Sequence, residues 1–497
     1  MEPLENLRKI RLEKLEKIRK LKIDPYPAKS EKKQSVAECL KSQGKNIRTA
    51  GRIIGFRTHG GSSFADIFDE TGKIQLFFSK SQLSNVSGQL LELLDIGDFV
   101  EVSGKVDKTK AGEVTIFIQS FKLLAKSTRP MPSSWYGLKD VEERYRKRYL
   151  DLILNHEVRK VFEMRSKVIQ AHREFLLNKG YLEVETPVLQ PLYGGGLARP
   201  FKTYHNALGI PLYLRISTEL YLKRLIVAGF ENVFEIAKVF RNEGIDREHN
   251  PEFTILETMA AYKDYKDNME LLSEMTEFVV KKVTGSAKVD YGQDKIDFSR
   301  PWKKLTMVEA VNAATGFDFG KVKSTDDAKK QAEKLKIELK PHQNTWGLIL
   351  AAIFEQKAEK QLINPTIIYD FPTETSPLAK RAKDSRFVER FEHFAGGMEA
   401  SNNYSELNDP QDLAERFKDE RKKERLGEEE AHQTDKDFIE SLEFGMPPTS
   451  GIGPSIDRLV MVLTNSRSIK DVILFPTLRQ KYQPSNSESD ISARTRK

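Results

Sequence analysis

Residues 47–125 contain five short stretches rich in β-branched and aromatic residues, and they limit the possible folds more than any other feature. The stretches are IRTAGRIIGFRT, SSFADIFDE, GKIQLFFSK, FVEVSGKV and EVTIFIQSFKLL. Turn-forming pairs such as Gly60–Gly61 and Thr71–Gly72 separate them, which is typical of strands joined by tight turns. Five strands in so short a segment favour a small closed barrel, and we predict an OB-fold domain over residues 29–135.

The segment before the barrel is basic and has helical spacing. Over residues 4–22, leucines and isoleucines recur at helical intervals with Lys and Arg between them, and Asp24–Pro27 ends the pattern. We assign residues 1–28 to a basic N-terminal helix. It is either a solvated helix that packs on its neighbour or an auxiliary arm for an RNA backbone. Residues 126–135, with two prolines, are predicted to be a linker.

Composition excludes several classes of protein. The 497 residues carry a formal net charge of +8, which permits a nucleic-acid partner without proving one. The single cysteine, Cys39, excludes an internal disulfide framework and any cysteine-cluster metal site. No apolar run approaches the roughly 18 residues of a membrane helix, so we expect no membrane association. The N-terminus lacks the apolar core of a signal peptide, and we expect a cytoplasmic protein.

The rest of the chain mixes both periodicities, which predicts an α+β domain over residues 136–479. A long helix over 155–179 is expected to end at Gly180. The segment 410–432 is dense in charge and predicts an exposed helix, whereas the polar tail 480–497 is expected to be disordered. Further strands are expected at 181–186, 211–216, 232–241 and 252–262, and further helices at 263–283 and 347–361.

No phosphate-binding loop and no dinucleotide fingerprint is present, so any nucleotide chemistry needs another device. The segment VFRNEGIDREHNPEF (239–253) predicts a hairpin in which Arg241 can meet a phosphate and Phe253 can stack on a base. From its charges alone, this hairpin could equally be a surface salt-bridge structure.

Two further segments contain glycines where a ligand could approach the backbone. TSGIGPSIDRLVMVLT (449–464) predicts a glycine-containing turn that runs into an apolar helix with Arg458 in its first turn. EVETPVLQPLYGGGLARPF (183–201) predicts a strand closed by Pro187, and then a flexible loop over Gly194–Gly196. Alone, each of these segments could be an ordinary turn.

In their order, the three segments resemble motifs 1, 2 and 3 of the class II aminoacyl-tRNA synthetases. Further strings narrow the resemblance to the lysyl-tRNA synthetases of bacterial type, over residues 4–479. They are RYRKRYLDLI (144–153), GGGLARPF (194–201), LRISTELYLKRLIVAGFENVFEIAKVFRNEG (214–244), HNPEFTILE (249–257), SELND (405–409), GMPPTSGIG (445–453) and IDRLVMVLTNSRSIKDVILFP (456–476).

The resemblance implies an N-terminal OB-fold that binds the anticodon, followed by a catalytic antiparallel sheet flanked by helices. Motif 1 would cover about 155–187 and form a homodimer interface, motif 2 about 232–257, and motif 3 about 449–464. The implied reaction joins L-lysine to ATP, releases pyrophosphate, and then transfers lysine to tRNA(Lys).

The resemblance also implies site residues. Arg241 and Arg458 would be catalytic and would bind ATP together with Glu243, His249, Phe253 and Glu399. Glu399 and Glu406 would hold Mg²⁺, although without the resemblance this segment could be a solvated acidic loop. The lysine pocket would contain Gly195, Glu219, Glu257, Asn402, Tyr404 and Glu406. Arg57, Phe64, Gln75 and Glu113 would read the anticodon, although Phe64 could instead be a core ring.

Two positions depart from the family pattern. Ser455 stands where a third glycine is usual in motif 3, and Met259 stands where a tyrosine commonly lines the lysine pocket. Two other functions compete with aminoacylation. One is a related ligase that attaches lysine to a protein, but such paralogues lack the barrel. The other is a nucleic-acid-binding protein with an inactive synthetase domain, but that would be expected to lose Arg241, Arg458 or the metal-binding carboxylates.

Overall fold

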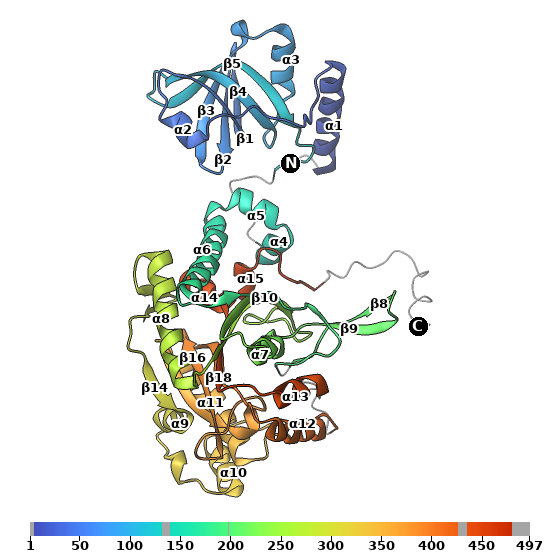
Figure 1. Ribbon diagram of the computed structural model, residues 1–497. Helices are drawn as coiled ribbons and strands as arrows, with labels where there is room; N and C mark the ends of the chain where they lie inside the picture. Colours follow the sequence, from blue (N-terminus) through green and yellow to red (C-terminus); the bar gives the residue numbers. More distant parts are fainter. Residues whose placement is uncertain (1–3, 132–139, 197, 426–434, 480–497) are drawn as a thin grey trace, which may run out of the picture. The chain divides into compact units, whose positions relative to one another are not determined.

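The computed structural model describes residues 4–131, 140–196, 198–425 and 435–479. The chain divides into two compact units, residues 1–137 and 138–497 (Figure 1). The predicted tail 480–497 and part of the predicted linker, residues 132–135, lie outside the described residues.

Five strands of the first unit form a closed barrel in the order β1-β2-β3-β5-β4. Along β2, buried side chains alternate with partly buried ones because successive residues point to opposite faces. The predicted OB-fold is therefore confirmed. The strands are β1 (Asn46–His59), β2 (Ser62–Asp69), β3 (Gly72–Ser79), β4 (Phe99–Lys108) and β5 (Val114–Ala125), with α2 (Val36–Leu40), η1 (Lys80–Gln82) and α3 (Asn85–Leu93) beside them.

The basic N-terminal segment forms helix α1 (Leu4–Lys20), which packs on the barrel. Leu15 and Ile18 are buried, and Arg11 donates hydrogen bonds to the carbonyl oxygens of Ile96 and Ser127 at 3.0 and 3.1 Å. Lys14 lies 2.7 Å from Asp95. One face of α1 is thus a packing face, as the first interpretation of this segment proposed.

An eight-stranded sheet organises the second unit, in the order β14-β15-β16-β17-β18-β11-β10-β6. Its six central strands are antiparallel, as predicted, whereas the outermost pairs β14–β15 and β10–β6 are parallel. The strands are β6 (Leu182–Glu183), β10 (Asn232–Phe240), β11 (Glu252–Ala261), β14 (Lys303–Thr306), β15 (Thr366–Pro372), β16 (Phe387–Ala395), β17 (Met398–Ser405) and β18 (Thr449–Pro454).

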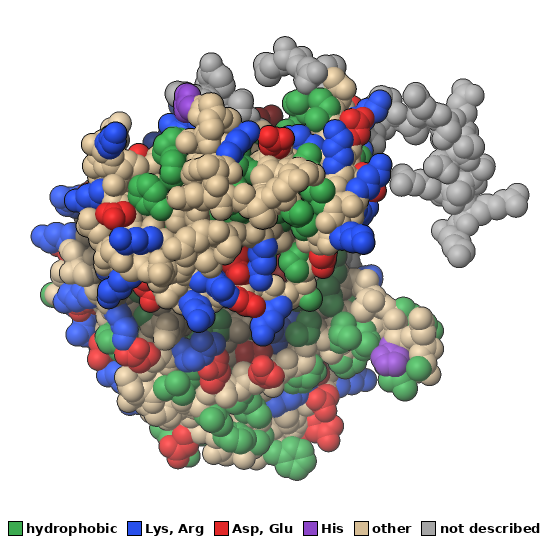
Figure 2. All heavy atoms as spheres, turned by 90° about the horizontal axis from the view of Figure 1, so that it is seen from above, with side chains coloured by type: hydrophobic (Ala, Val, Ile, Leu, Met, Phe, Trp, Pro, Cys, Tyr) green, Lys and Arg blue, Asp and Glu red, His purple; other side chains and the backbone are tan. Residues whose placement is uncertain are grey.

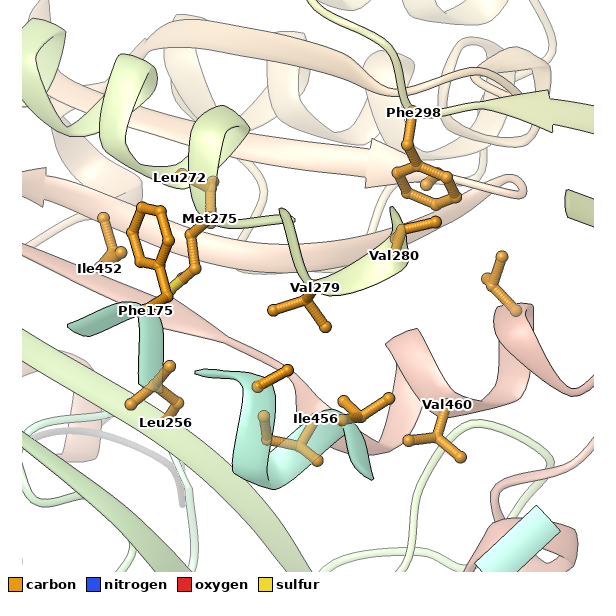
Figure 3. Packing of buried hydrophobic residues seen from close by; sticks show 14 of the residues in the cluster. Phe175, Leu256, Leu272, Met275, Val279, Val280, Phe298, Ile452, Ile456 and Val460 are labelled. Carbon is orange, nitrogen blue, oxygen red and sulfur yellow. The ribbon is translucent and has the colours of Figure 1, made fainter. Parts of the chain in front are cut away.

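Three helices build the main core against this sheet: α6 (His156–Asn178), α8 (Tyr265–Thr284) and α14 (Ile456–Leu463). Figure 3 shows Phe175, Leu272 and Val460 from these helices around Ile452 and Leu256 of the sheet. Burying such a continuous apolar layer stabilises the unit by roughly 25 cal/mol for each Å² removed from water. Gly180 follows α6 with φ +81°, as expected for the glycine after a helix end.

Smaller elements surround the sheet. β7 (Leu189–Gln190), β9 (Ile210–Leu214) and β8 (Lys202–His205) form a separate three-stranded sheet, in which the β8–β9 hairpin projects from the body (Figure 1). The others are α4 (Val141–Arg146), α5 (Arg148–Leu154), α7 (Glu219–Val227), β12 (Lys288–Tyr291), β13 (Asp294–Asp297), α9 (Met307–Thr315), η2 (Phe319–Lys321), α10 (Thr325–Lys334), α11 (Trp346–Lys357), η3 (Glu359–Gln361), η4 (Thr373–Thr375), α12 (Pro410–Arg425), α13 (Lys436–Glu443) and α15 (Ile469–Val472).

Two sequence predictions are wrong. The glycine-containing segment 449–454 is not a turn but strand β18, between β17 and β11, where glycines leave room for neighbouring side chains. Helix α12 is not exposed on all sides, because Leu413 and Phe417 are both 1% exposed. The many charged residues of this segment made the narrow apolar stripe of Leu413 and Phe417 hard to recognise in the sequence.

The surface carries charges of both signs. Figure 2 shows Lys and Arg side chains spread over the face in view, with acidic side chains between them. Among the described residues, no helix combines the length and the apolar character that crossing a membrane requires.

Candidate active site

One cavity of about 420 Å³ in the second unit is lined by every candidate residue predicted for that unit. The loop between β10 and β11, the strands β17 and β18, and the start of α7 supply its walls. The lining includes Gly195, Glu219, Arg241, Glu243, His249, Phe253, Glu257, Glu399, Asn402, Tyr404, Glu406 and Arg458. Residues far apart in the sequence are therefore brought together as the motifs predicted.

Arg241 supplies a free positive charge to this cavity. It follows β10, and its guanidinium lies 5.2 Å from the ring centroid of Phe253. Its Nε is 3.4 Å from the carbonyl oxygen of Ile216. Among the described residues, no carboxylate forms an ion pair with Arg241, so the guanidinium is available for an anionic ligand.

Arg458 is held by a network at the first turn of α14. Its Nη1 donates to the carbonyl oxygen and to Oε2 of Glu399, at 2.6 and 2.8 Å. Its Nη2 lies 3.4 Å from Nε2 of His249. Ser455 caps α14 by accepting a hydrogen bond from the Arg458 amide at 3.3 Å, with φ −78°. Serine in place of the usual glycine therefore causes no backbone strain, and it adds a helix cap.

Three glutamates gather at the other end of the cavity. Glu257 accepts hydrogen bonds from Oγ of Ser217 at 2.7 Å and from the amide of Thr218 at 2.8 Å. The hydroxyl of Tyr404 donates to Oε2 of Glu219 at 2.5 Å. Burial raises the pKa of Glu257, since water no longer stabilises its charged form. This end of the cavity is acidic and suits a cationic group.

Lys223 lies behind these carboxylates and was not among the predicted site residues. Its ammonium is 2.5 Å from Oε1 of Glu219 and forms a second ion pair with Glu406. Burial acts to lower the pKa of Lys223, but the two carboxylates outweigh it and the pKa is raised. Burial also raises the pKa of Glu406 to about 8, against the pull of Lys223. Lys223 lies four residues after Glu219 on the same helix face, and this spacing is the sequence feature that could have indicated the ion pair.

Met259 forms part of the wall beside Gly451. A Cβ on Gly451 would lie 2.8 Å from Cε of Met259 and 2.7 Å from Oε1 of Glu406. Gly195 is equally tight, because it has φ +83° and a Cβ there would lie 2.9 Å from Oγ of Ser217. Both glycines therefore allow a close approach between backbone and side chains.

The two carboxylates expected to share Mg²⁺ have different partners. Glu399 binds Arg458, whereas Glu406 binds Lys223. Glu392 is the acidic neighbour of Glu399: burial raises its pKa to about 8 despite Arg390, and the Glu399 charge adds to the rise. Burial also acts to raise the pKa of Glu399, but Arg458 outweighs it and the pKa is lowered. Among the described residues, no three His, Cys, Asp or Glu side chains form a metal-binding cluster.

Arg390 is a second residue that the sequence did not single out. Its Nε donates to Oδ1 of Asn402 at 2.9 Å, and its Nη1 donates to Oγ of Ser376 at 2.7 Å. It also forms an ion pair with Glu392, two residues along the same face of β16. In the sequence this pair is an Arg-x-Glu pattern, which is common and by itself does not indicate a functional site.

The anticodon candidates share one outer face of the barrel. Phe64 is half-buried on β2 and lies outside the barrel core, with its ring centroid 5.1 Å from that of Phe77. Phe117 continues the row, 5.3 Å from Phe77. Gln75 Nε2 donates to Oε2 of Glu113 at 3.1 Å. Arg57 pairs with Phe64 in the β1–β2 register, so all four predicted residues lie on neighbouring strands or at their ends.

Comparison with known families agrees with this geometry. The model of "tRNA synthetases class II (D, K and N)" matches residues 140–479, more than half of the chain. The chain belongs to this family. The model of an "OB-fold nucleic acid binding domain" matches residues 47–124.

Curated relatives of this class II synthetase match almost end to end. The protein "Lysine--tRNA ligase" of Carboxydothermus hydrogenoformans is 49% identical over 485 residues, which cover 97% of this chain and 99% of the relative. The "Lysine--tRNA ligase" of Clostridium novyi is 51% identical over 88% of this chain and 86% of its own. That of Moorella thermoacetica is 47% identical over 97% of this chain and 100% of its own.

Proposed function

We propose that this synthetase is a lysine–tRNA ligase, which activates L-lysine with ATP and transfers it to the 3′ end of tRNA(Lys). One observation carries the proposal: a single cavity holds an acidic pocket at one end and the unpaired guanidinium of Arg241 at the other. The near-full-length similarity to relatives named lysine–tRNA ligase supports the same choice.

The acidic pocket selects among the three amino acids in the family's description. Glu219, Glu257 and Glu406 offer three carboxylates to the substrate. Aspartate would bring a further negative charge, and the neutral side chain of asparagine would offset less of the pocket's negative charge than lysine does. Lysine supplies two ammonium groups, so its binding pairs charges that water no longer stabilises.

In the first step, an oxygen of the lysine carboxylate attacks the α-phosphorus of ATP. A new oxygen–phosphorus bond forms as the bond to the bridging oxygen breaks, and pyrophosphate leaves. The nucleophile is already anionic, so the protein needs to position the reactants and offset negative charge rather than remove a proton. Arg241 would bind the α-phosphate, and Phe253 and Arg458 would sandwich the adenine.

Glu243 and His249 would complete the ATP contacts, and carboxylates at the same end would bind Mg²⁺. Oε1 of Glu243 is buried without a hydrogen-bond partner among the described residues, which fits a polar ligand there. The charge of Glu399 contributes to the raised pKa of Glu392, so the two carboxylates lie near each other, and carboxylates are the oxygen ligands that Mg²⁺ prefers. We therefore propose Glu392, rather than Glu406, beside Glu399 as a metal ligand. Bound Mg²⁺ would supply positive charge to the phosphates.

In the second step, a terminal ribose hydroxyl of the tRNA attacks the carbonyl carbon of lysyl-adenylate. The bond to the phosphate oxygen breaks, AMP leaves with the bonding electrons, and the hydroxyl proton passes to the released phosphate group. The barrel would hold the anticodon. Phe64 would stack on an unpaired base and Gln75 would read a base edge, with Arg57 and Glu113 as further contacts.

Exposed apolar residues near motif 1 support a homodimer. Leu182, Val188 and Leu189 are 48, 39 and 48% exposed, although they are aliphatic. A second copy that covers them would remove this surface from water. We place the reaction in the cytoplasm, where translation takes place.

The deciding experiment measures exchange of pyrophosphate into ATP with each of the twenty amino acids and Mg²⁺. Exchange with lysine, followed by lysylation of tRNA(Lys), supports the proposal. Exchange with lysine but attachment to a protein instead of tRNA would favour the related ligase. Folded protein without any exchange would favour a nucleic-acid-binding protein with an inactive catalytic domain.

A further inference from the structure

Lys223 lies in the wall of the amino-acid pocket, behind the groups that line the cavity. Its side chain is 1% exposed, so its charge is shielded from water. It lies one helical turn after Glu219 on α7, and its ammonium contacts Oε1 of Glu219 at 2.5 Å and also Glu406. The ring centroid of Tyr404 lies 5.5 Å from Nζ and covers the same site.

The ammonium changes the charge that the pocket presents. Three carboxylates, those of Glu219, Glu257 and Glu406, line the cavity, and with all three ionised the one lysine behind them leaves a net charge of −2. Two of the carboxylates are bound by Lys223. The third, Glu257, receives only neutral donors from Ser217 and Thr218, and no described residue forms an ion pair with it.

We propose that Lys223 is a positioning residue that sets the pocket's charge to match the two ammonium groups of lysine and leaves Glu257 as the carboxylate free to bind one of them. The proposal rests on the proposed function, because it takes lysine as the substrate. It adds a residue that does not touch the substrate but determines where the substrate's charges can bind.

The physical reason is competition for the same carboxylates. Without Lys223, Glu219 and Glu406 would face each other without a cation in a region that water does not reach. A substrate ammonium would then be drawn into the vacated position between them. The substrate carboxylate would move with it, away from the phosphate-binding end at Arg241, and a displacement of this kind slows a reaction that depends on alignment.

The test compares Lys223→Met with the wild-type protein in lysine-dependent exchange of pyrophosphate into ATP. Methionine keeps much of the side-chain length and removes the charge. We expect kcat/KM for lysine to fall at least tenfold while KM for ATP changes less than threefold. Lys281→Met is the matched control, because Lys281 forms an i,i+4 ion pair with Glu277 on the exposed surface of α8.

A double variant separates positioning from simple support of the fold. Lys223→Met with Glu406→Gln removes one positive and one negative charge and restores the net charge of −2. We expect it to be more active with lysine than Lys223→Met alone, whereas a purely structural role predicts no recovery. If Lys223→Met does not fold, the double variant alone decides, since it leaves one carboxylate without its cation instead of two.

Several outcomes overturn the proposal. They are wild-type kcat/KM in Lys223→Met, a folded double variant without recovery, and failure of both variants to fold, which would make Lys223 a residue of fold stability. The proposed function fails separately: in that case the wild-type protein itself shows no exchange with lysine.

Discussion

Gly451 is a position where adding one methyl group should reduce lysine activation without unfolding the protein. In Gly451→Ala, the new Cβ would lie 2.7 Å from Oε1 of Glu406 and 2.8 and 2.9 Å from Cε and Sδ of Met259. Ordinary contacts of a Cβ begin at about 3.4 Å, so at least one neighbour must move by several tenths of an ångström. Met259 and Glu406 both line the cavity, so the ends of their side chains would move into the space that the amino acid occupies.

The magnitude follows from the cost of overpacking. Inserting a methyl group into a closely packed site costs about 1–3 kcal/mol. If this cost falls on the pocket, kcat/KM for lysine should drop by about 5- to 150-fold, since 1.4 kcal/mol corresponds to a factor of ten. KM for ATP should change less than threefold, because the added atom faces the amino-acid end of the cavity.

Lysine-dependent exchange of pyrophosphate into ATP, together with thermal unfolding, measures both effects. Gly88→Ala is the control, because a Cβ on that glycine of α3 meets no atom within 4 Å. Adding Met259→Ala to Gly451→Ala removes two of the three close contacts and should restore part of the activity. Unchanged kcat/KM for lysine in folded Gly451→Ala would contradict this prediction, because the pocket would then accommodate the added methyl group and lysine together.

Three further predictions concern other parts of the molecule. Arg241→Ala should lower the exchange of pyrophosphate into ATP at least about 100-fold with the fold retained, because an oriented charge is lost. Arg247→Ala is the control, because Arg247 is exposed in the same loop. Near-normal exchange in Arg241→Ala would exclude the phosphate role. Phe64→Ala should reduce kcat/KM for tRNA(Lys) by about 5- to 150-fold while exchange stays unchanged, because stacking on a base is worth about 1–3 kcal/mol. Val86→Ala, 49% exposed on α3, is its control, and equal loss of both activities would place Phe64 in a structural role. Burial raises the pKa of Glu392 from 4.5 to about 8, so without ligands its contribution to stability is present below pH 4.5 and is lost as pH rises through about 8. Glu392→Gln should therefore remove a slope of up to about 1.4 kcal/mol per pH unit in the free energy of unfolding, measured with denaturant from pH 5 to 9, and parallel wild-type and variant curves would contradict it.

The parts of the fold that were predictable are those where local patterns agree with the final structure. Strand β2 of the barrel alternates between buried and less buried residues because one of its faces lies in the core, so its period of two is visible in sequence. The candidate site residues could be named because motifs 2 and 3 are contiguous. Strand β18 was missed because Gly451 and Gly453 have no side chains to show an alternating pattern.

Contacts between distant segments were beyond the reach of the sequence. Lys223 and Glu406 are separated by 183 positions and meet only because α7 and the end of β17 border one cavity. The same holds for Arg390 and Ser376, and for the partners that distinguish Glu399 from Glu406. Amino-acid type alone does not reveal which of several carboxylates faces a cation and which faces another carboxylate.

Strand β18 serves the hydrophobic core and the active site at once. Ile452 is buried in the core formed with α6, α8 and α14 (Figure 3). It also lines the cavity together with Gly451 and Gly453 on either side of it. The floor of the cavity is therefore fixed to the core, whereas residues of the loop over 241–251 and of the segment over 375–379 form other parts of the wall. Any displacement of β18 that widens the cavity would therefore also disturb the packing of the core.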